Sequence, residues 1–394
     1  MTKHILYFFI LMTLCQNGYN QGVTRSLNIP DIPLGVDRFF WGKSEEGFSL
    51  YLSSFSTSGF AIVNFMQDGS IENAFRVQHS NSDFLANYFP TVYRRRGDWH
   101  AVSQKGQPNG FESAGTRLFI INTSAGEQMA WRLSETHFLP FRHSFVGQNL
   151  LLTQHGMGQE NNIERLQFAQ IDVSTREILW SKSYGVTGFS NVTISFLDEE
   201  LLPNGNVVGM GGLLFGDGSH NYNFLIELNQ AGEIVRSILH ENTMSFKKIG
   251  TDNQGNIFLI GASNNAAPIP NDAILAKLSP AFELIWSKQL HAENFDYLNT
   301  TLQTDSTGDV YFSYSTFGDL PVIAGKISAA GELLWYNGYA AHNPQILIDD
   351  ALRFYITSDR QYSSDGSFQD ARIIMRTDEQ GLLGDCEVLL LALN

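Results

Sequence analysis

The chain has 394 residues, of which 43% are hydrophobic and only 16% are charged. Its 40 acidic residues outnumber its 25 basic ones, which gives a formal net charge of −15. Nucleic acids and anionic membranes bind clustered lysine and arginine, and the one basic run of this chain, Arg94–Arg96, is short. The composition therefore argues against a nucleic-acid-binding protein.

Residues 1–22 have the pattern of a signal peptide. Lys3 precedes an apolar run, Ile5–Leu14, which has the length of a signal core and is too short to span a bilayer. No later segment reaches membrane-spanning length, so we expect a secreted or cell-surface protein, periplasmic or extracellular. A lipid anchor on Cys15 is the alternative, although the small residue that normally precedes such a cysteine is missing. Cleavage would leave Cys386 alone, so no disulfide within the chain is expected.

After this leader, a turn followed by a strand recurs along the chain. Glycine suits these positions, because a tight hairpin turn often needs a positive φ, which Gly, Asn and Asp tolerate best. The turn glycines, spaced 50–58 residues apart, are Gly47, Gly97, Gly147, Gly205, Gly255 and Gly308. A seventh copy near Asp350–Leu352 has lost its glycine. The cell-adhesion tripeptide Arg96–Asp98 falls on one of these turns, so the repeat already explains its glycine.

A second pattern, a hairpin that leads into an aromatic strand, alternates with the first. Its copies lie at Asp68–Ile71, Ala125–Trp131, Thr175–Trp180, Ala231–Val235, Ala281–Trp286, Ala330–Trp335 and Gln380–Leu383. Four of them end in tryptophan, namely Trp131, Trp180, Trp286 and Trp335. We expect these side chains to pack between neighbouring repeat units rather than to stack on a ligand.

Seven alternating copies of both patterns predict a unit of four short strands. In the sixth copy the expected strands are Leu298–Thr304, Asp309–Ser315, Val322–Ile327 and Leu333–Tyr339. No long segment has a helical apolar period. One four-stranded sheet cannot bury both of its faces, whereas sheets packed face to face around an axis can. We therefore expect an all-β fold, a seven-bladed β-propeller of four-stranded antiparallel blades.

The expected domain organisation is a signal peptide at residues 1–22, a linker at 23–36 and the propeller at 37–394. The last strand is expected at Glu387–Leu391. Each unit looks complete within its own stretch. The first and last blades should then close the ring by packing, without exchange of a strand.

The hairpin Gly331–Trp335 resembles the repeats of secreted bacterial β-propeller proteins. It is more distantly similar to the tryptophan-docking repeats of quinoprotein dehydrogenases. The resemblance covers nearly all of the chain after the leader and implies the propeller fold. Quinoprotein dehydrogenases usually have eight blades, an adjacent cysteine pair and a calcium site beside the quinone. This chain has seven units and no adjacent cysteines, so the resemblance does not extend to quinone chemistry and no cofactor is expected.

Histidines recur just after the fourth strand of several units. They are His79, His137, His240, His291 and His342. A ring of imidazoles would suit a metal or an acidic ligand, but their variable position favours separate peripheral turns, so no metal site is predicted.

Long inserts between the second and third strands should share a face with these histidines, and binding residues commonly sit on such loops. Asp217, His220, Tyr222, Tyr362 and Asp365 are the candidates for contact with a ligand. An ordinary solvated loop is the competing interpretation.

The acidic pairs Glu199–Glu200 and Asp349–Asp350 would serve glycoside hydrolysis only if two carboxylates converged, and a solvated turn is the simpler interpretation. No nucleophile elbow, phosphate loop or zinc spacing is present. We therefore expect an exported binding or scaffold propeller that presents loops to a glycan, peptide or protein partner. The alternative is a hydrolase or lyase whose carboxylates and histidines converge at the central channel. A fragment of a longer surface protein is a third interpretation.

Overall fold

In the part of the chain described by the computed structural model, every regular element is a β-strand. The described residues are 25–26, 38–44, 47–53, 59–66, 71–78, 88–96, 98–106, 116–122, 124–125, 127–132, 141–157, 164–175, 177–185, 192–215, 221–241, 244–263, 272–290, 295–316, 322–339, 341, 344–348, 352–362, 368–383 and 389–390. Their strands form seven sheets, six of four strands and one of five. Within these ranges no helix has the length and hydropathy needed to cross a membrane.

The first four sheets are numbered here in chain order. Sheet 1 contains β2 (Arg38–Ser44), β3 (Gly47–Ser53), β4 (Gly59–Met66) and β5 (Ile71–Gln78). Sheet 2 contains β6 (Tyr88–Arg96), β7 (Trp99–Gly106), β8 (Thr116–Asn122) and β9 (Glu127–Arg132). Sheet 3 contains β10 (Phe141–Val146), β11 (Asn149–Met157), β12 (Glu164–Asp172) and β13 (Ile178–Gly185). Sheet 4 contains β14 (Val192–Leu201), β15 (Val207–Phe215), β16 (Asn221–Leu228) and β17 (Ile234–Glu241).

The last three sheets continue the series. Sheet 5 contains β18 (Met244–Thr251), β19 (Ile257–Ser263), β20 (Ala273–Leu278) and β21 (Leu284–Leu290). Sheet 6 contains β22 (Phe295–Thr304), β23 (Val310–Thr316), β24 (Val322–Ile327) and β25 (Leu333–Tyr339). Sheet 7 contains β26 (Gln345–Ile348), β27 (Phe354–Tyr362), β28 (Phe368–Arg376), β29 (Leu389–Leu390) and β1 (Arg25–Ser26).

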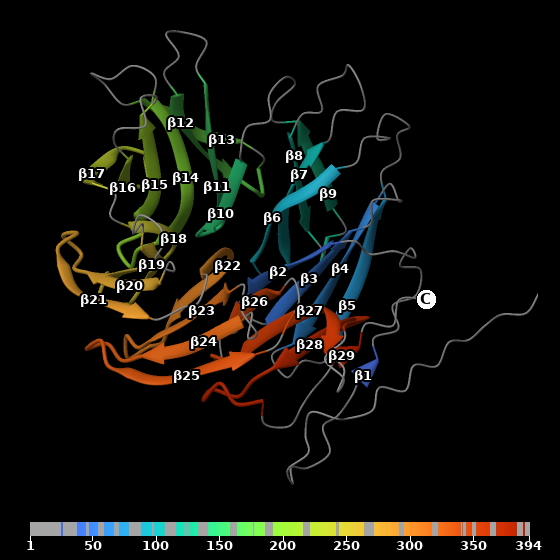
Figure 1. Cartoon of the computed structure of the whole chain (residues 1–394). Coiled ribbons are helices and arrows are strands. Elements are labelled where there is room, and N and C mark those ends of the chain that lie inside the picture. The colour runs from blue at the N-terminus through green and yellow to red at the C-terminus, as the bar shows by residue number, and fades with distance from the viewer. Residues whose placement is uncertain are drawn as a thin grey trace, which may run out of the picture.

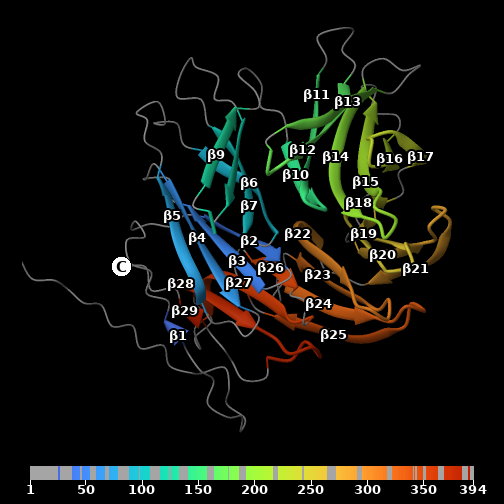
Figure 2. The same cartoon turned by 180° about the vertical axis from the view of Figure 1, so that it is seen from behind.

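The sheets follow one another in chain order around a common centre (Figures 1 and 2), and the first strand of each lies innermost. Strand β18, for example, contacts the first strands of both neighbouring sheets, β14 and β22. Strand β2 likewise contacts β6 on one side and β26 of sheet 7 on the other. The strands of sheet 6 agree with those expected from the sequence, β24 and β25 residue for residue.

Sheet 7 corrects the expected closure. The N-terminal strand β1 pairs in parallel with β29, with Arg25 opposite Leu389 and Ser26 opposite Leu390. The expectation that the first and last units meet without strand exchange is therefore wrong. An edge strand such as β29 has an unpaired row of backbone N–H and C=O groups, and a second strand satisfies them. Two residues are too few for a recognisable strand pattern in the sequence.

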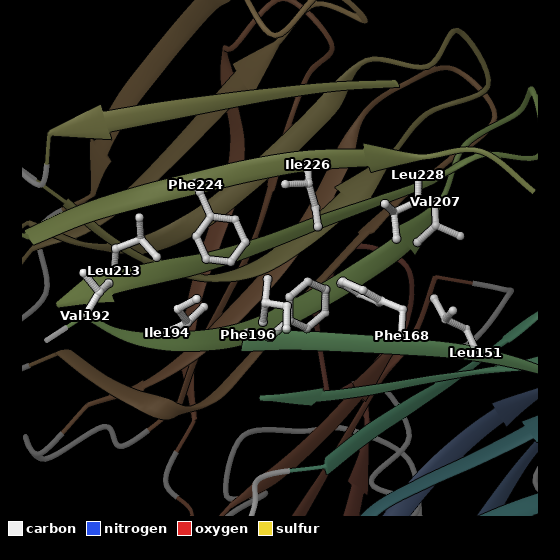
Figure 3. Close-up of a cluster of buried hydrophobic side chains, with 11 residues drawn as sticks. Leu151, Phe168, Val192, Ile194, Phe196, Val207, Leu213, Phe224, Ile226 and Leu228 are labelled. Carbon is white, nitrogen blue, oxygen red and sulfur yellow. The ribbon is translucent and has the colours of Figure 1, made fainter. Parts of the chain in front are cut away.

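Apolar side chains fill the space between neighbouring sheets. Figure 3 shows the cluster between sheets 3 and 4, where Phe168 lies against Phe196. Their ring centroids are 5.3 Å apart and the ring planes are 84° apart, an edge-to-face contact that aromatic rings favour. Because each sheet is covered on both faces, a central strand such as β23 is buried along its whole length.

The recurring turns use left-handed backbone conformations. Gly147, Gly205, Gly255 and Gly308 of the first pattern have φ between +62° and +84°. Leu352 takes the place of the missing seventh glycine and keeps a positive φ of 61°. Gly97 lies outside the described residues.

The tryptophans dock onto the turns of the next sheet. A Cβ on Gly232 of sheet 4 would lie 2.6 Å from the ring of Trp180 in sheet 3, so only glycine leaves room for the indole. The Trp180 Nε1 donates a hydrogen bond to the carbonyl of Gln230, at 2.8 Å. Trp286 packs in the same way on Gly331, and Trp335 on Gly381. The predicted packing between units is confirmed for these three; the side chain of Trp131 is not among those described.

Candidate functional site

The strand order defines two opposite faces of the molecule. In sheets 3 to 6 the first and third strands each pass to the next strand through a tight turn, and both turns lie at the same end because neighbouring strands are antiparallel. At the other end the second strand leads to the third, and the fourth strand leads to the next sheet. We call the first end the turn face and the second end the loop face. Of the candidate binding residues, Tyr222, His240 and Tyr362 lie in described strands, each at a strand end on the loop face.

Two of the predicted binding residues lie on neighbouring strands of sheet 4 near the loop face, with their side chains on opposite faces of the sheet. Tyr222 is near the start of β16 and His240 is near the end of β17, and His240 pairs with Asn223, the residue after Tyr222. His240 is exposed, whereas Tyr222 is half-buried with its ring against Phe215, 5.6 Å between centroids. These two side chains therefore come from neighbouring strands of one sheet.

The other predicted residues are not brought together by the described structure. Tyr362 is the last residue of β27, and its side chain is not described. The remaining candidates lie outside the described residues, namely His79, His137, Asp217, His220, His291, His342 and Asp365. Their binding role stays a prediction.

The structure adds a charged group that the sequence interpretation missed. Asp198 lies on β14, the innermost strand of sheet 4, and is almost fully buried. Its Oδ1 is 3.0 Å from Lys248 Nζ in sheet 5 and 3.4 Å from Arg142 Nη1 in sheet 3. Its Oδ2 accepts a hydrogen bond from the backbone N–H of Ile249, at 3.1 Å. One carboxylate therefore joins the innermost strands of three consecutive sheets.

A bulge in β14 helps to place this carboxylate. The pairing with β15 shifts between Phe196 and Asp198, so that Leu197 is the extra residue. The same shift occurs in β18 between Phe246 and Lys248, with Lys247 as the extra residue. Burial lowers the pKa of Lys247, because the charged form loses hydration there.

The neighbouring acidic residue also differs from its sequence interpretation. Glu199 was expected in a solvated turn, but it is a buried residue of β14 and accepts a hydrogen bond from the Ser144 hydroxyl of sheet 3. Asp349–Asp350, the other acidic pair, lies outside the described residues. A signal in the sequence pointed to this group, since Asp198 and Lys248 both precede a turn glycine by seven residues. Opposite charges at one repeat position of adjacent units predict an ion pair between them.

The chemistry open to this group follows from its geometry. Arg142 and Lys248 keep about a third of their side-chain surface exposed, at 34% and 30%, while Asp198 is covered. Such a pair of cations on a fixed carboxylate can hold neighbouring sheets together and present positive charge near the centre of the ring. Among the residues that the structure describes, no three His, Cys, Asp or Glu side chains are grouped as a metal site requires.

No known family model and no curated protein sequence matches this chain. Solved structures do match it. The β-propeller domain of the Trilobed protease from Pyrococcus furiosus, described as having an open velcro topology, is 10% identical over 87% of this chain and 96% of that one, with a TM-score of 0.50. The fold is a β-propeller.

Two further matches come from enzymes. A polysaccharide lyase is 9% identical, with a TM-score of 0.52 over 92% of this chain and 94% of that one. Prolyl oligopeptidase B from Galerina marginata is 11% identical, with a TM-score of 0.52 over 88% of this chain and 50% of that one. The chain spans about half the length of this oligopeptidase and of the acylaminoacyl peptidase from Pyrococcus horikoshii, which it also matches. At these identities the likeness shows the fold and nothing about activity.

Proposed function

We propose that this protein is an exported binding propeller of seven blades, which holds a glycan, peptide or protein partner on its loop face. The observation that supports the proposal is the strand order, in which the second strand leads to the third and the fourth strand to the next sheet at one face, and the long inserts and the histidines of the sequence fall in these connections. The opposite face carries short turns. Variable loops on a rigid scaffold are the usual place for recognition.

The seven blades and their closure belong to the same proposal. Seven sheets in the described residues, the contact of β2 with β26 and the pairing of β1 with β29 support one ring. Export is proposed from residues 1–22 of the sequence, and the mass of the chain recovered outside the cytoplasm tests it. A mass that still contains the apolar run Ile5–Leu14 would contradict a cleaved signal.

The binding proposal is tested with arrays of glycans and peptides and a variant of the loop face. The variant replaces residues 216–220 by a Gly-Ser segment of equal length, which removes Asp217 and His220. Glu379→Ala, an exposed change at a hairpin turn of sheet 7, is the matched control on the turn face. We expect array ligands to be lost or weakened by the loop variant and kept by the control. Ligands that only the Glu379→Ala change removes would overturn the proposal.

A hydrolase or lyase is the second candidate, and the Asp198 group favours it. Two buried carboxylates, Asp198 and Glu199, lie on an innermost strand beside partly exposed Arg142 and Lys248. Turnover of polysaccharide or peptide substrates by the purified chain, lost in a folded Asp198→Asn variant, would support this candidate. Turnover that survives the substitution would remove these residues from the mechanism.

A further inference from the structure

A pocket of about 110 Å³ lies between sheets 4 and 5. Its walls are mostly apolar and include Met210, Leu225 and Ile238 from sheet 4 and Leu259, Phe246 and Phe282 from sheet 5. Asn223 and His240, which pair across β16 and β17, line the end of the pocket nearest the loop face.

The pocket lies at the interface where the tryptophan–glycine contact between neighbouring sheets is replaced by other residues. Sheets 3, 5 and 6 each place a tryptophan on a glycine of the following sheet. Sheet 4 has Arg236 at the tryptophan position, and sheet 5 has Phe282 at the glycine position, with φ of 68°. The Arg236 guanidinium lies 5.1 Å from the centroid of the Phe282 ring. It also donates to the carbonyl of Pro280, the equivalent of the Gln230 carbonyl that accepts from Trp180.

A second aromatic position is also changed. In sheets 3 and 6, the hydroxyls of Tyr184 and Tyr339, four residues after the tryptophan, donate to the carbonyls of Gly232 and Gly381 in the next sheet. The equivalent residue of sheet 4 is His240, which is exposed. Strand β17 therefore contributes no Trp, Tyr or Phe ring to this interface. Phe282 fills part of the space, and the pocket is the part that stays open.

The pocket between sheets 3 and 4 is a weaker candidate. Its volume is about 170 Å³, and it is lined by Tyr184 and by Leu239, which is 55% exposed. It is the more open of the two. A more open pocket gives a single small molecule less contact than the less open pocket beside Phe282.

We propose that the pocket between sheets 4 and 5 binds a single-ring aromatic molecule of the phenol class. An apolar protein cavity of about 150 Å³ holds benzene, so the volume here suits one ring and not a larger ligand. The rings of Phe246 and Phe282 offer aromatic contacts. Asn223 and His240 offer polar groups for a hydroxyl at the loop-face end. This site shares His240 with the loop-face candidates, but it lies between two sheets and does not depend on the partner binding proposed for the loops.

The test is a titration of the purified full propeller with phenol, followed by calorimetry or ligand-observed NMR. We expect saturable binding with one site per chain. Ile238→Phe fills the pocket from sheet 4 and should weaken phenol binding about tenfold or more. Ile178→Phe is the matched control, since Ile178 is exposed on β13 and does not line the pocket.

A second pair of variants covers the case in which Ile238→Phe fails to fold. Leu284 lies at the exposed rim of the pocket, and Leu333 occupies the same repeat position in sheet 6. Leu284→Phe should weaken phenol binding and Leu333→Phe should not. Absence of saturable binding to the wild type, or equal loss in both members of a pair, would overturn the proposal. Failure of every glycan or peptide on the arrays would leave it standing.

Discussion

Phe282 and Leu352 hold a backbone conformation that the other copies of their turns give to glycine, with φ of 68° and 61°. A left-handed conformation costs an L-residue about 1–2 kcal/mol. Both side chains offset that cost by burial, since Phe282 is 7% exposed and Leu352 packs against the cluster around Phe354. Burial of apolar surface stabilises the fold by about 25 cal/mol per Å², so the burial of a phenyl ring offsets the backbone strain.

Substitutions at two glycines distinguish the free-energy cost of backbone strain from the cost of displacing a docked tryptophan. Gly147 and Gly232 both have positive φ, at 62° and 74°, but a Cβ on Gly147 meets nothing within 4 Å. Gly147→Ala should therefore lower the free energy of unfolding by about 1 kcal/mol, the cost of the backbone alone. Gly232→Ala must also displace Trp180 and should cost at least about 2 kcal/mol more. Urea unfolding of both variants measures the difference, and equal losses would argue against docking.

Tyr339 predicts a loss of stability in alkaline solution. Burial raises the pKa of its hydroxyl to about 12. The unfolded chain ionises this group near pH 10, so the stability that it contributes is full below pH 10 and is lost as the pH rises toward 12. The difference in unfolding free energy between the wild type and Tyr339→Phe should shrink by about 1 kcal/mol from pH 9 to pH 11. A difference that stays constant over this range would contradict the burial of the hydroxyl.

At the scale of elements, the interface between sheets 4 and 5 has other residues at the positions that form the tryptophan–glycine contact elsewhere, and these residues also contact one another. In sheet 3 a glutamine, Gln170, accepts from Trp180 Nε1 at 2.8 Å. The equivalent position of sheet 4 is Glu227, which is buried and lies 2.9 Å from Arg236 Nε. A tryptophan at position 236 would remove the cation from Glu227 Oε2, while Oε1 would keep the hydrogen bond from the Asn206 amide. Three positions therefore change together.

This coupling predicts how substitutions combine. Arg236→Trp alone would clash with Phe282 and remove the cation from Glu227. Phe282→Gly alone would leave a cavity. Each should lower the free energy of unfolding by about 2–4 kcal/mol. The triple variant Glu227→Gln, Arg236→Trp, Phe282→Gly rebuilds the Gln170–Trp180–Gly232 arrangement. It should be more stable than either single variant by at least about 1 kcal/mol. Additive losses in a thermal unfolding series would show that the three positions are independent.

The elements differ in how far the sequence predicts them. The strands of sheet 6 and the docked tryptophans follow from turn glycines and aromatic spacing, which are local signals. The bulges at Leu197 and Lys247 do not, because an extra residue in a strand leaves no local pattern. Asp198 was missed although it shares its distance from a turn glycine with Lys248, and Glu199 was noted but expected in a solvated turn. Two adjacent carboxylates suggest a solvated turn until partners from other sheets are known.

At the scale of the whole molecule, the repeat predicts the chain-order ring of sheets and the common face of the loops. It does not predict β1, since a two-residue strand depends on its partner for its existence. Most of the candidate binding residues belong to loop segments whose positions the repeat pattern does not specify. A repeat predicts the strands and turns that every unit shares, whereas binding depends on loop residues that differ between units.

The pairing of β1 predicts an effect of N-terminal truncation. A chain that starts at residue 27 lacks β1, while a chain that starts at residue 23 keeps it. We expect the shorter chain to fold but to lose protection in hydrogen exchange at whichever of Leu389 and Leu390 has its amide facing β1, because adjacent amides of a strand point to opposite sides and the other faces β28. Its melting temperature should fall by a few degrees, as about 1 kcal/mol does in a domain of this size. Identical exchange at both residues would show that β1 contributes nothing to sheet 7.

The same pair has a mechanical consequence. Strands β1 and β29 are parallel, and the rest of the chain leaves them from opposite ends. A force that pulls the two chain ends apart therefore acts along the strands and loads their hydrogen bonds together, in shear. An antiparallel pair at this place would open one bond at a time. The β1–β29 pair should therefore resist separation best when the force pulls the N-terminus and the C-terminus in opposite directions.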